Sequence, residues 1–450
     1  MKILSADHVL PISAAPISKG AVLIEKDVIL AVGTAENLKK DYPAAEAENF
    51  GEAVIMPGLV NAHSHLELTA MRGFLDHLEN DFSAWLLTLS KTRGEKLSDE
   101  DIEISAIWGA LEGLRGGVTC FADIGRYGEA GFEALKKTGL RGIVYQETEF
   151  SPVNSEAEND FARLEKKFLA LKENETALVK AGISPHSPYT VSRRLFEIIG
   201  EYAVRENVPL SIHAAESKAE LEFMLYGTGF FARIYEKFGV EWQTPALDTI
   251  RYLEQTGILR AKPLLAHCVK VTDENLNIIS KTDSRIAHCP KSNAKFGHGV
   301  APFEKFLTNK LRVGFGSDSA ASNNICDILE EARFASFFSR AREDCASLIS
   351  AREIIETAAL GGARALGLET EIGTLETGKQ ADLIVISLKN AAQQPVHDIY
   401  SALLFASSAR DNYLTMVAGE EIYRDGIAKT VDETELKTKM NEIARKMNLN

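Results

Sequence analysis

The stretch Val54–Glu67, which reads VIMPGLVNAHSHLE, places the strongest constraint on how this chain can fold. Its apolar residues predict a buried strand, and the strand runs into His63 and His65. Residues two apart on a strand point to the same side, so the two imidazoles converge on one point. Neutral imidazole is the commonest nitrogen ligand of a transition metal. The stretch therefore predicts the start of a metal site, provided that later strands supply more ligands.

Strand and helix patterns alternate over residues 54–369. Eight β–α units in a row, with apolar strands, predict an α/β fold of the closed (β/α)8 TIM-barrel type. The alternative, an open doubly wound sheet, needs a phosphate-binding glycine turn after a strand. No G-x-G-x-x-G sequence follows a strand: Gly314-x-Gly316 lacks the third glycine, and Gly361-Gly362 lies in a helical pattern where close packing is expected. After the first strand, the expected strands are Gly117–Ile124, Leu140–Gln146, Leu178–Ser184, Val208–Ala214, Pro263–Cys268, Arg285–His288 and Leu311–Gly316.

The two ends of the chain carry a different pattern, made of short strands and turns. Ala21–Glu25 and Val28–Val32 predict a hairpin, and similar segments return at Ala381–Leu388, Tyr413–Val417 and Glu421–Arg424. The N-terminal segment is too short to close its own core. We therefore expect one small β-sandwich domain built from residues 1–53 and 370–430, with a C-terminal helix over residues 431–450.

The composition narrows the class of protein. The 450 residues carry a net charge of −14, whereas nucleic-acid binders need basic surfaces, so we expect no nucleic-acid partner. The sequence shows no signal-peptide pattern and no apolar run of the roughly 20 residues that cross a bilayer, so we expect no membrane association. Five scattered cysteines fit free thiols in a reducing cytoplasm better than a disulfide framework. A homodimer is an arrangement that the sequence leaves open.

Polar residues recur where the expected strands end. In barrel enzymes the carboxyl ends of the strands form the face that carries the chemistry. The side chains at these positions are therefore the candidates for a common site. In chain order they are His63, His65, His186, His213, His267, His288 and Asp318.

Four of these side chains form a suitable set of metal ligands. Catalytic zinc typically takes three or more protein ligands and keeps a position for water. Zn²⁺ and Fe²⁺ both accept three nitrogens and one oxygen, and we expect one divalent metal per chain, zinc. A second ion would need a bridging group such as a modified lysine, but Lys180 lies at the start of its strand, on the wrong side of the barrel. The ligands of this set are His63, His65, His213 and Asp318.

The catalytic residues are expected beside these ligands. Glu216 lies just beyond a strand, where a carboxylate can move a proton between water and substrate, although a carboxylate is also favoured there as the start of a helix. His267 is expected to bond the attacking water or the tetrahedral oxygen, and Asp318 to hold a proton as well as the metal. Cys268 and Cys289 each follow a histidine on a strand, face away from it and are interpreted as core thiols.

At these positions the sequence resembles the amidohydrolase superfamily, and within it the cytosine, guanine and S-adenosylhomocysteine or methylthioadenosine deaminases, with the related triazine hydrolases. The resemblance implies a barrel with a small β domain, one metal, and hydrolytic deamination of a ring amidine, here the adenine of a small nucleoside converted to hypoxanthine with release of ammonia. It also implies the ligand set given above, with Glu216 as the proton shuttle and His267 as the hydroxide-orienting histidine. The motifs that carry it are PGLVNAHSH, SPHSPYT, HAAES, LLAHCV, HCPKSNAKFGHGVAP, GFGSDSAASNN and GTLETGKQADLIVI.

The substrate-binding residues are inferred from the same resemblance. Methylthioadenosine and adenosylhomocysteine deaminases carry an arginine just after the third strand, where this chain reads VYQETEF. That departure and the stretch FMLYGTGFF resemble the aminodeoxyfutalosine deaminases of the futalosine route to menaquinone, whose substrate carries an aromatic carboxylate. The expected substrate-binding residues are His186, Trp85, Arg93, Gln146, Glu147 and His288, and the candidate cations for the carboxylate are Arg72, Arg93 and Arg126.

Three alternatives remain at this point. The same centre could serve S-adenosylhomocysteine or methylthioadenosine deamination, or a triazine-type hydrolysis that expels chloride or an alkylamine. A third alternative is a non-catalytic, metal-stabilised binding protein. Glu216 and His267 argue against the third, because neither residue is needed to hold a metal.

Overall fold

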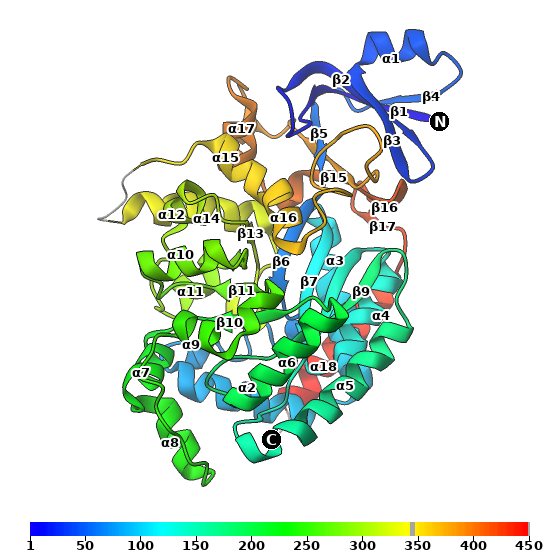
Figure 1. Cartoon of the computed structure of the whole chain (residues 1–450). Coiled ribbons are helices and arrows are strands. Elements are labelled where there is room, and N and C mark those ends of the chain that lie inside the picture. Colours follow the sequence, from blue (N-terminus) through cyan, green and yellow to red (C-terminus); the bar gives the residue numbers. More distant parts are fainter. Residues whose placement is uncertain (343–346, 449–450) are drawn as a thin grey trace.

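The computed structural model describes residues 1–342 and 347–448, and its larger part consists of parallel strands surrounded by helices (Figure 1). Strands β6 to β9 form one parallel sheet and β10 to β13 a second, and single parallel bridges join Ser64 to Asp318 and Ile183 to Leu210. The strands thus follow one another in chain order, and the predicted α/β barrel fold is confirmed. They are β6 (Leu59–Ser64), β7 (Val118–Gly125), β8 (Arg141–Glu147), β9 (Val179–Ser184), β10 (Ser211–Ala214), β11 (Leu264–His267), β12 (Arg285–His288) and β13 (Val313–Phe315).

Helices follow these strands and bury one face each. α3 begins at a capping box in which Ser98 and Asp101 satisfy each other's backbone N–H groups. The helices around the barrel are α3 (Asp99–Arg115), α4 (Gly128–Thr138), α5 (Ala157–Glu173), α6 (Arg193–Glu206), α9 (Thr249–Thr256), α10 (Asp273–Lys281), α11 (Pro290–Lys295), α12 (Phe303–Thr308), α13 (Ala320–Asn323), α14 (Ile328–Ala341), α15 (Ala351–Glu356) and α16 (Gly362–Leu366).

The pair Gly361-Gly362 lets the last of these helices approach the strands. A Cβ atom at Gly362 would lie 2.6 Å from Cβ of Val60, and one at Gly361 would lie 2.5 Å from the carbonyl oxygen of Val313. Any larger residue would push the helix away from β6 and β13. Close packing, as expected from the sequence, is therefore the role of this pair.

Both ends of the chain contribute to a second sheet, of nine strands among the described residues, with β5 between β14 and β1. The predicted sandwich is thus one continuous sheet, and its two halves share an apolar cluster that includes Leu4, Ile55 and Val385. The elements are β1 (Lys2–Val9), β2 (Ile17–Glu25), β3 (Val28–Thr34), α1 (Ala35–Asp41), β4 (Glu46–Asn49), β5 (Ala53–Pro57), β14 (Leu383–Ser387), β15 (Asn412–Val417), β16 (Glu420–Arg424) and β17 (Ile427–Ala428), with α17 (Ile399–Ser401) before β15.

The boundary between the two parts differs from the predicted one at residue 54. Ala53–Pro57 pairs with β14 and β1 in the terminal sheet, and the barrel begins at Leu59, beyond Gly58. Both segments are completely buried, and the residues on each side of Gly58 are apolar, so hydrophobicity alone does not reveal that the chain passes from one sheet to another there.

The terminal sheet packs against the amino ends of the barrel strands. Arg141, the first residue of β8, is buried and donates hydrogen bonds of 2.8 and 3.1 Å to the Asp382 carboxylate, just before β14. Removing one partner of such a pair would leave a buried charge unpaired, so the pair ties the two parts together. The carboxyl ends of the strands remain free for a site.

Helices from two segments of the chain cover these carboxyl ends, at the end of the molecule opposite the terminal sheet (Figure 1). They are α2 (Phe82–Lys96), α7 (Lys218–Tyr226) and α8 (Gly229–Lys237). The predicted C-terminal helix is present as α18 (Glu433–Asn448), and its Lys446 pairs with Asp101 of the barrel. Among residues 1–342 and 347–448, none of the helices has the length and apolar character needed to traverse a bilayer.

Candidate metal centre and active site

Four donor atoms meet where β6, β10 and β13 end. The Nε2 atoms of His63 and His65 lie 3.5 and 3.6 Å from Oδ1 of Asp318, and His65 Nε2 lies 3.2 Å from His213 Nε2. The sequence-predicted ligand set is thus brought together in space. His63, His65 and Asp318 also form one of the groups of side chains that could share a single ion, and His213 belongs to a neighbouring group with His63.

The protonation of the histidines indicates that a cation fits between them. His65 Nδ1 lies 3.0 Å from the carbonyl oxygen of Ile124, and His213 Nδ1 lies 3.1 Å from that of His186. Carbonyls only accept, so each Nδ1 carries the proton and each Nε2 presents a lone pair. Two lone pairs that face each other at 3.2 Å repel unless a positive ion lies between them. This donor set fits a divalent transition metal.

The charges of the four donor side chains also fit a divalent metal ion. Burial lowers the pKa of His63 to about 4 and the pKa of His213 well below its usual value, so both rings are neutral ligands. Burial favours protonated Asp318, but its interactions with His63 outweigh burial and hold its pKa well below the usual range. Ser292 and Ser322 donate to Oδ2 of Asp318 at 2.5 and 2.9 Å, which leaves Oδ1 to face the histidines.

The backbone is strained at the same strand ends. Ala215, His267, Cys268 and Asp318 all have φ between 47° and 74° although none is glycine. Such residues cost free energy and persist only where the surrounding structure holds them, and they gather at functional sites. Two of these residues, His267 and Asp318, belong to the groups of side chains that could hold a metal ion.

Glu216 is a buried carboxylate that holds no place among the four ligands. Its Oε1 lies 3.7 Å from His267 Nε2, and the backbone N–H groups of Ala215 and Glu216 are fixed by the Glu220 carboxylate at 2.9 and 2.7 Å. Burial raises the pKa of Glu216 to about 7, with a further increase from Asp318. A carboxyl group with a pKa near 7 can both accept and release a proton at neutral pH.

Asn293 is a residue of this site that sequence reasoning missed. Its Oδ1 lies 2.9 Å from Nδ1 of His267, which makes that nitrogen a donor and leaves His267 Nε2 as the atom facing Glu216 and the metal site. The motif that contains it, HCPKSNAKFGHGVAP, carried the family resemblance, but nothing in its spacing places Asn293 beside a histidine of another strand.

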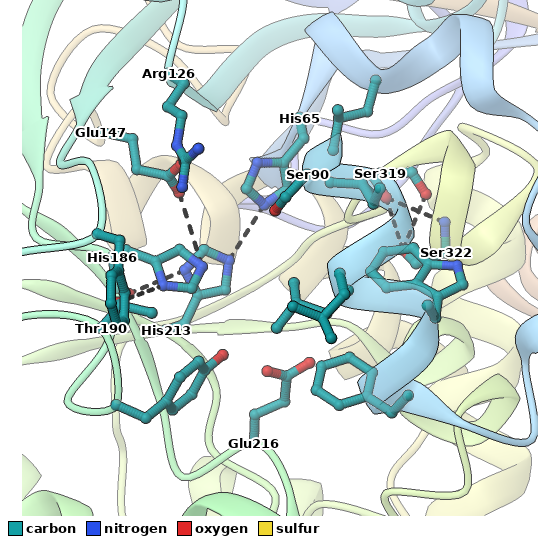
Figure 2. A pocket seen from close by; sticks show the side chains of 18 of the residues that line it. His65, Ser90, Arg126, Glu147, His186, Thr190, His213, Glu216, Ser319 and Ser322 are labelled. Atoms are coloured by element: carbon teal, nitrogen blue, oxygen red, sulfur yellow. Dashed lines mark hydrogen bonds and ion pairs between the residues drawn. The ribbon is translucent and has the colours of Figure 1, made fainter. Parts of the chain in front are cut away.

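A cavity of about 300 Å³ opens above the metal site. Figure 2 shows Glu216 pointing into it from one side, with His186, His213 and His65 across from it. Trp85, Glu147 and His186 line the cavity as predicted, and Glu147 Oε1 lies 3.9 Å from His186 Nε2. Much of the cavity wall is apolar, and its lining includes Phe82, Leu86, Leu89, Phe150, Phe230, Phe231, Ile234, Phe238 and Phe296.

Two predicted substrate-binding residues do not line the cavity. Gln146 donates to the carbonyl oxygens of Arg126 and Glu147, because side chains alternate along β8 and only Glu147 points inward. His288 stacks on Phe303, with ring centroids 5.3 Å apart, and burial lowers its pKa to about 3. We therefore assign Gln146 a structural role, in which it bonds the backbone at the end of β8, and we assign His288 to the buried core beside Phe303.

The three candidate arginines have different surroundings. Arg93 lines the cavity, but its guanidinium is buried and donates to Glu67 at 2.5 Å. Arg72 lies outside the cavity lining and pairs with Glu112. Arg126 lines the cavity, is about one-third exposed, and lies 3.9 Å from Glu147. Arg126 is therefore the arginine in the best position for an anion at the cavity mouth.

Two further predictions concern Lys180 as a possible bridge to a second metal ion and the cysteines as core thiols. Lys180 is half-exposed, pairs with Glu175 and does not line the cavity, so it offers no bridge for a second ion. Cys268 and Cys289 are buried and free, as expected for core thiols, and so are Cys120 and Cys326. Cys345 lies outside the described residues.

This geometry, with a mononuclear donor set at the carboxyl ends of a barrel, defines a class of metal-dependent hydrolases. The family model described as "Amidohydrolase family" matches residues 54–422, and a model of the bacterial imidazolonepropionase-like composite domain matches residues 20–45. The chain belongs to the amidohydrolase family and is an enzyme of the hydrolase class.

Individual proteins are similar over the whole length of the chain. A 5-methylthioadenosine/S-adenosylhomocysteine deaminase of Moorella thermoacetica is 33% identical over 439 residues, covering 97% of each protein. The crystal structure of an adenosine deaminase from Xanthomonas campestris with bound zinc superposes with a TM-score of 0.86 at 25% identity, covering 99% of this chain and 98% of that one. Helicobacter pylori aminofutalosine deaminase with methylthio-coformycin has a TM-score of 0.76 at 23% identity, covers 94% of this chain and 100% of its own, and shares the fold.

Proposed function

We propose that this protein is a hydrolytic deaminase that replaces the amino group of the adenine ring in a nucleoside with oxygen and releases ammonia. The observation that carries the proposal is the buried carboxylate of Glu216, poised beside a three-histidine, one-aspartate donor set at the floor of a cavity. The names of the similar proteins, adenosine deaminase among them, support the same reaction.

The residues that would hold the metal are His63, His65, His213 and Asp318, and zinc is the proposed ion because it is bound in the similar adenosine deaminase. When bound, a zinc ion lowers the pKa of water enough for it to act as a nucleophile near neutral pH. Zinc also has no redox chemistry, which suits a hydrolysis.

The side chains of this chain supply the proton transfers. The water oxygen adds to C6 of the ring as a proton reaches ring N1, which makes C6 tetrahedral, and the C6–N bond to the amino group then breaks. Glu216 accepts one proton from the attacking water and delivers it to ring N1, so that no negative charge accumulates there. Asp318 and Glu216 pass the second proton to the departing amine, and His267 orients the nucleophile. Both protons of the water are thus used, one on the ring and one on ammonia.

The apolar part of the cavity supports a proposal for the 5′ substituent of the nucleoside. Its wall is largely aromatic and aliphatic, and Arg126 is the partly exposed cation beside it. This combination suits an aromatic ring that carries a carboxylate. We therefore propose aminodeoxyfutalosine as the substrate, which would place the enzyme in the futalosine route to menaquinone. The second candidate is methylthioadenosine or S-adenosylhomocysteine, favoured by the name of the 33%-identical relative.

A direct comparison of substrates tests the proposal. The zinc-loaded enzyme should convert adenine nucleosides to hypoxanthine nucleosides, followed by the change in ultraviolet absorbance and by ammonia release. We expect kcat/KM for aminodeoxyfutalosine to exceed that for S-adenosylhomocysteine by at least about tenfold, which is about 1.4 kcal/mol of transition-state binding. Equal or reversed values would overturn the substrate assignment and leave the deaminase standing. Turnover of a chlorotriazine without any nucleoside deamination would contradict the deaminase itself.

Replacing Arg126 with glutamine tests whether Arg126 binds the carboxylate of the substrate. The variant should raise KM for aminodeoxyfutalosine by about 10- to 100-fold, since a charge-assisted hydrogen bond contributes roughly 1.5–3 kcal/mol. KM for the uncharged 5′-deoxyadenosine should change less than about twofold. The matched control is Arg72→Gln, outside the cavity lining, which should leave both substrates unaffected. An equal effect of Arg126→Gln on both substrates would rule out a role in carboxylate recognition.

A further inference from the structure

A second imidazole, that of His298, faces the Glu216 carboxylate and has no part in the proposed proton transfers. His298 Nε2 lies 3.6 Å from Oε1 of Glu216, on the same oxygen that faces His267 Nε2 at 3.7 Å. His298 follows α11, in a turn between Gly297 and Gly299 that both have positive φ. One oxygen of Glu216 is thus flanked by two rings, and no hydrogen bond is formed to the other, Oε2, by the described residues.

The His298 ring is held in one orientation. It packs edge-on against Phe82, with ring centroids 4.8 Å apart, and lies 5.5 Å from the ring of Phe296. Its backbone N–H donates to the carbonyl oxygen of Asn293 at 2.9 Å, and the side chain of Asn293 bonds His267. The same residue therefore positions both imidazoles relative to Glu216.

The His298 ring needs a partner that Glu216 can supply. His298 is only 6% exposed, and its Nε2 atom is buried without a hydrogen-bond partner among the described residues. Burial lowers the pKa of His298 to about 4, so the ring is neutral and offers one N–H donor without adding a charge. Catalytic hydrogen bonds are often long before substrate binds and shorten in the complex.

His298 does not belong to the groups of described side chains that lie close enough to share a metal ion. We propose that His298 is a positioning residue that donates from Nε2 to Oε1 of Glu216 and thereby aims Oε2 at the substrate. The inference rests on the proposed function, because it assigns His298 a role through the proton shuttle. It explains why a histidine, which is polar, lies inside an aromatic wall at this position.

Two substitutions separate the hydrogen bond from the packing. His298→Leu fills the space without a donor, and His298→Gln keeps an N–H near the place of Nε2. We expect kcat of the leucine variant to fall by about 10- to 100-fold, with KM within about twofold and zinc content unchanged, because one hydrogen bond to a charged group is lost. On a logarithmic scale, the glutamine variant should recover at least about a third of the kcat that the leucine variant loses. Equal losses in both variants would show that only the shape of the ring matters.

A double-mutant cycle tests whether His298 acts through Glu216. In a Glu216→Gln background, His298→Leu should cost less than about twofold further in kcat, since the group that it positions is already disabled. A full 10-fold loss in that background would overturn the proposal.

A structural readout does not depend on turnover of any nucleoside, and so separates this inference from the proposed function. Crystal structures of the zinc-loaded wild type and His298→Leu proteins should show Glu216 Oε1 within about 3.2 Å of His298 Nε2 in the first and a rotated Glu216 carboxylate in the second. An identical Glu216 conformation in both proteins would disprove the positioning role even if the enzyme is an active deaminase.

Discussion

Glu216→Gln will lower kcat by about 10²–10⁴-fold while the zinc content of the protein stays the same, because general acid–base groups typically contribute that much. Glutamine keeps the size of the side chain and its contact with His267 but cannot carry a proton. The measurement is steady-state deamination together with metal analysis of the same preparations. The matched control is Glu222→Gln, an acidic residue of α7 outside the cavity lining, which should keep the wild-type kcat. A Glu216→Gln enzyme with zinc and near-normal kcat would show that the proton takes another path.

The pH dependence of the wild type belongs to the same prediction. Glu216 must begin as a carboxylate in order to accept a proton from water, and burial raises its pKa to about 7. Activity is therefore present above this pKa and lost as the pH falls through it. Because the positive charge of a bound metal favours the carboxylate, the midpoint of kcat/KM should lie at or somewhat below pH 7. Glu216→Gln should remove this acid limb, whereas an unchanged limb in the variant would assign the ionisation to another group.

His63→Ala will lose both the metal and the activity. His63 is completely buried, and neither ring nitrogen has a hydrogen-bond partner within the described part of the chain. A bound metal ion would therefore supply the partner that the nitrogen lone pair of His63 lacks. Removing one ligand opens the four-ligand set and leaves a gap in a buried site whose other three donors are arranged for four-ligand binding, so the metal affinity should fall strongly. We expect about one zinc per chain in the wild type by elemental analysis, and less than a tenth of that in the variant.

The exposed His397 supplies the control for this experiment. His397→Ala should keep the full zinc content and wild-type kcat, since this side chain is exposed and does not line the cavity. Adding zinc in excess should restore little activity to His63→Ala. Two ions per wild-type chain, or a His63→Ala protein that retains its metal, would overturn the four-ligand, single-ion assignment.

The amino-acid sequence by itself determined the architecture and the centre of the site. Strand and helix periodicities are local, so the order of β–α units could be read along the chain, and the rule that chemistry collects at the carboxyl ends of barrel strands then gathered His63, His65, His213 and Asp318. Glu216 followed because it lies three residues beyond the proposed ligand His213. These assignments used the direction in which side chains leave a strand, the ligand preferences of zinc and the family resemblance.

The tertiary structure alone decided which of the other polar residues reach the cavity. Alternation along β8 lets only one of Gln146 and Glu147 face the cavity, and the tertiary structure decides that it is Glu147, while Arg93 is engaged by Glu67, which lies 26 residues earlier in the chain. The crossing from the terminal sheet to the barrel at Gly58 was hidden because the residues next to it on both sides are buried and apolar. His298 approaches Glu216 from 82 positions later in the sequence. Such pairings depend on how loops of different β–α units fold over one another, and no local pattern in the sequence records that distance.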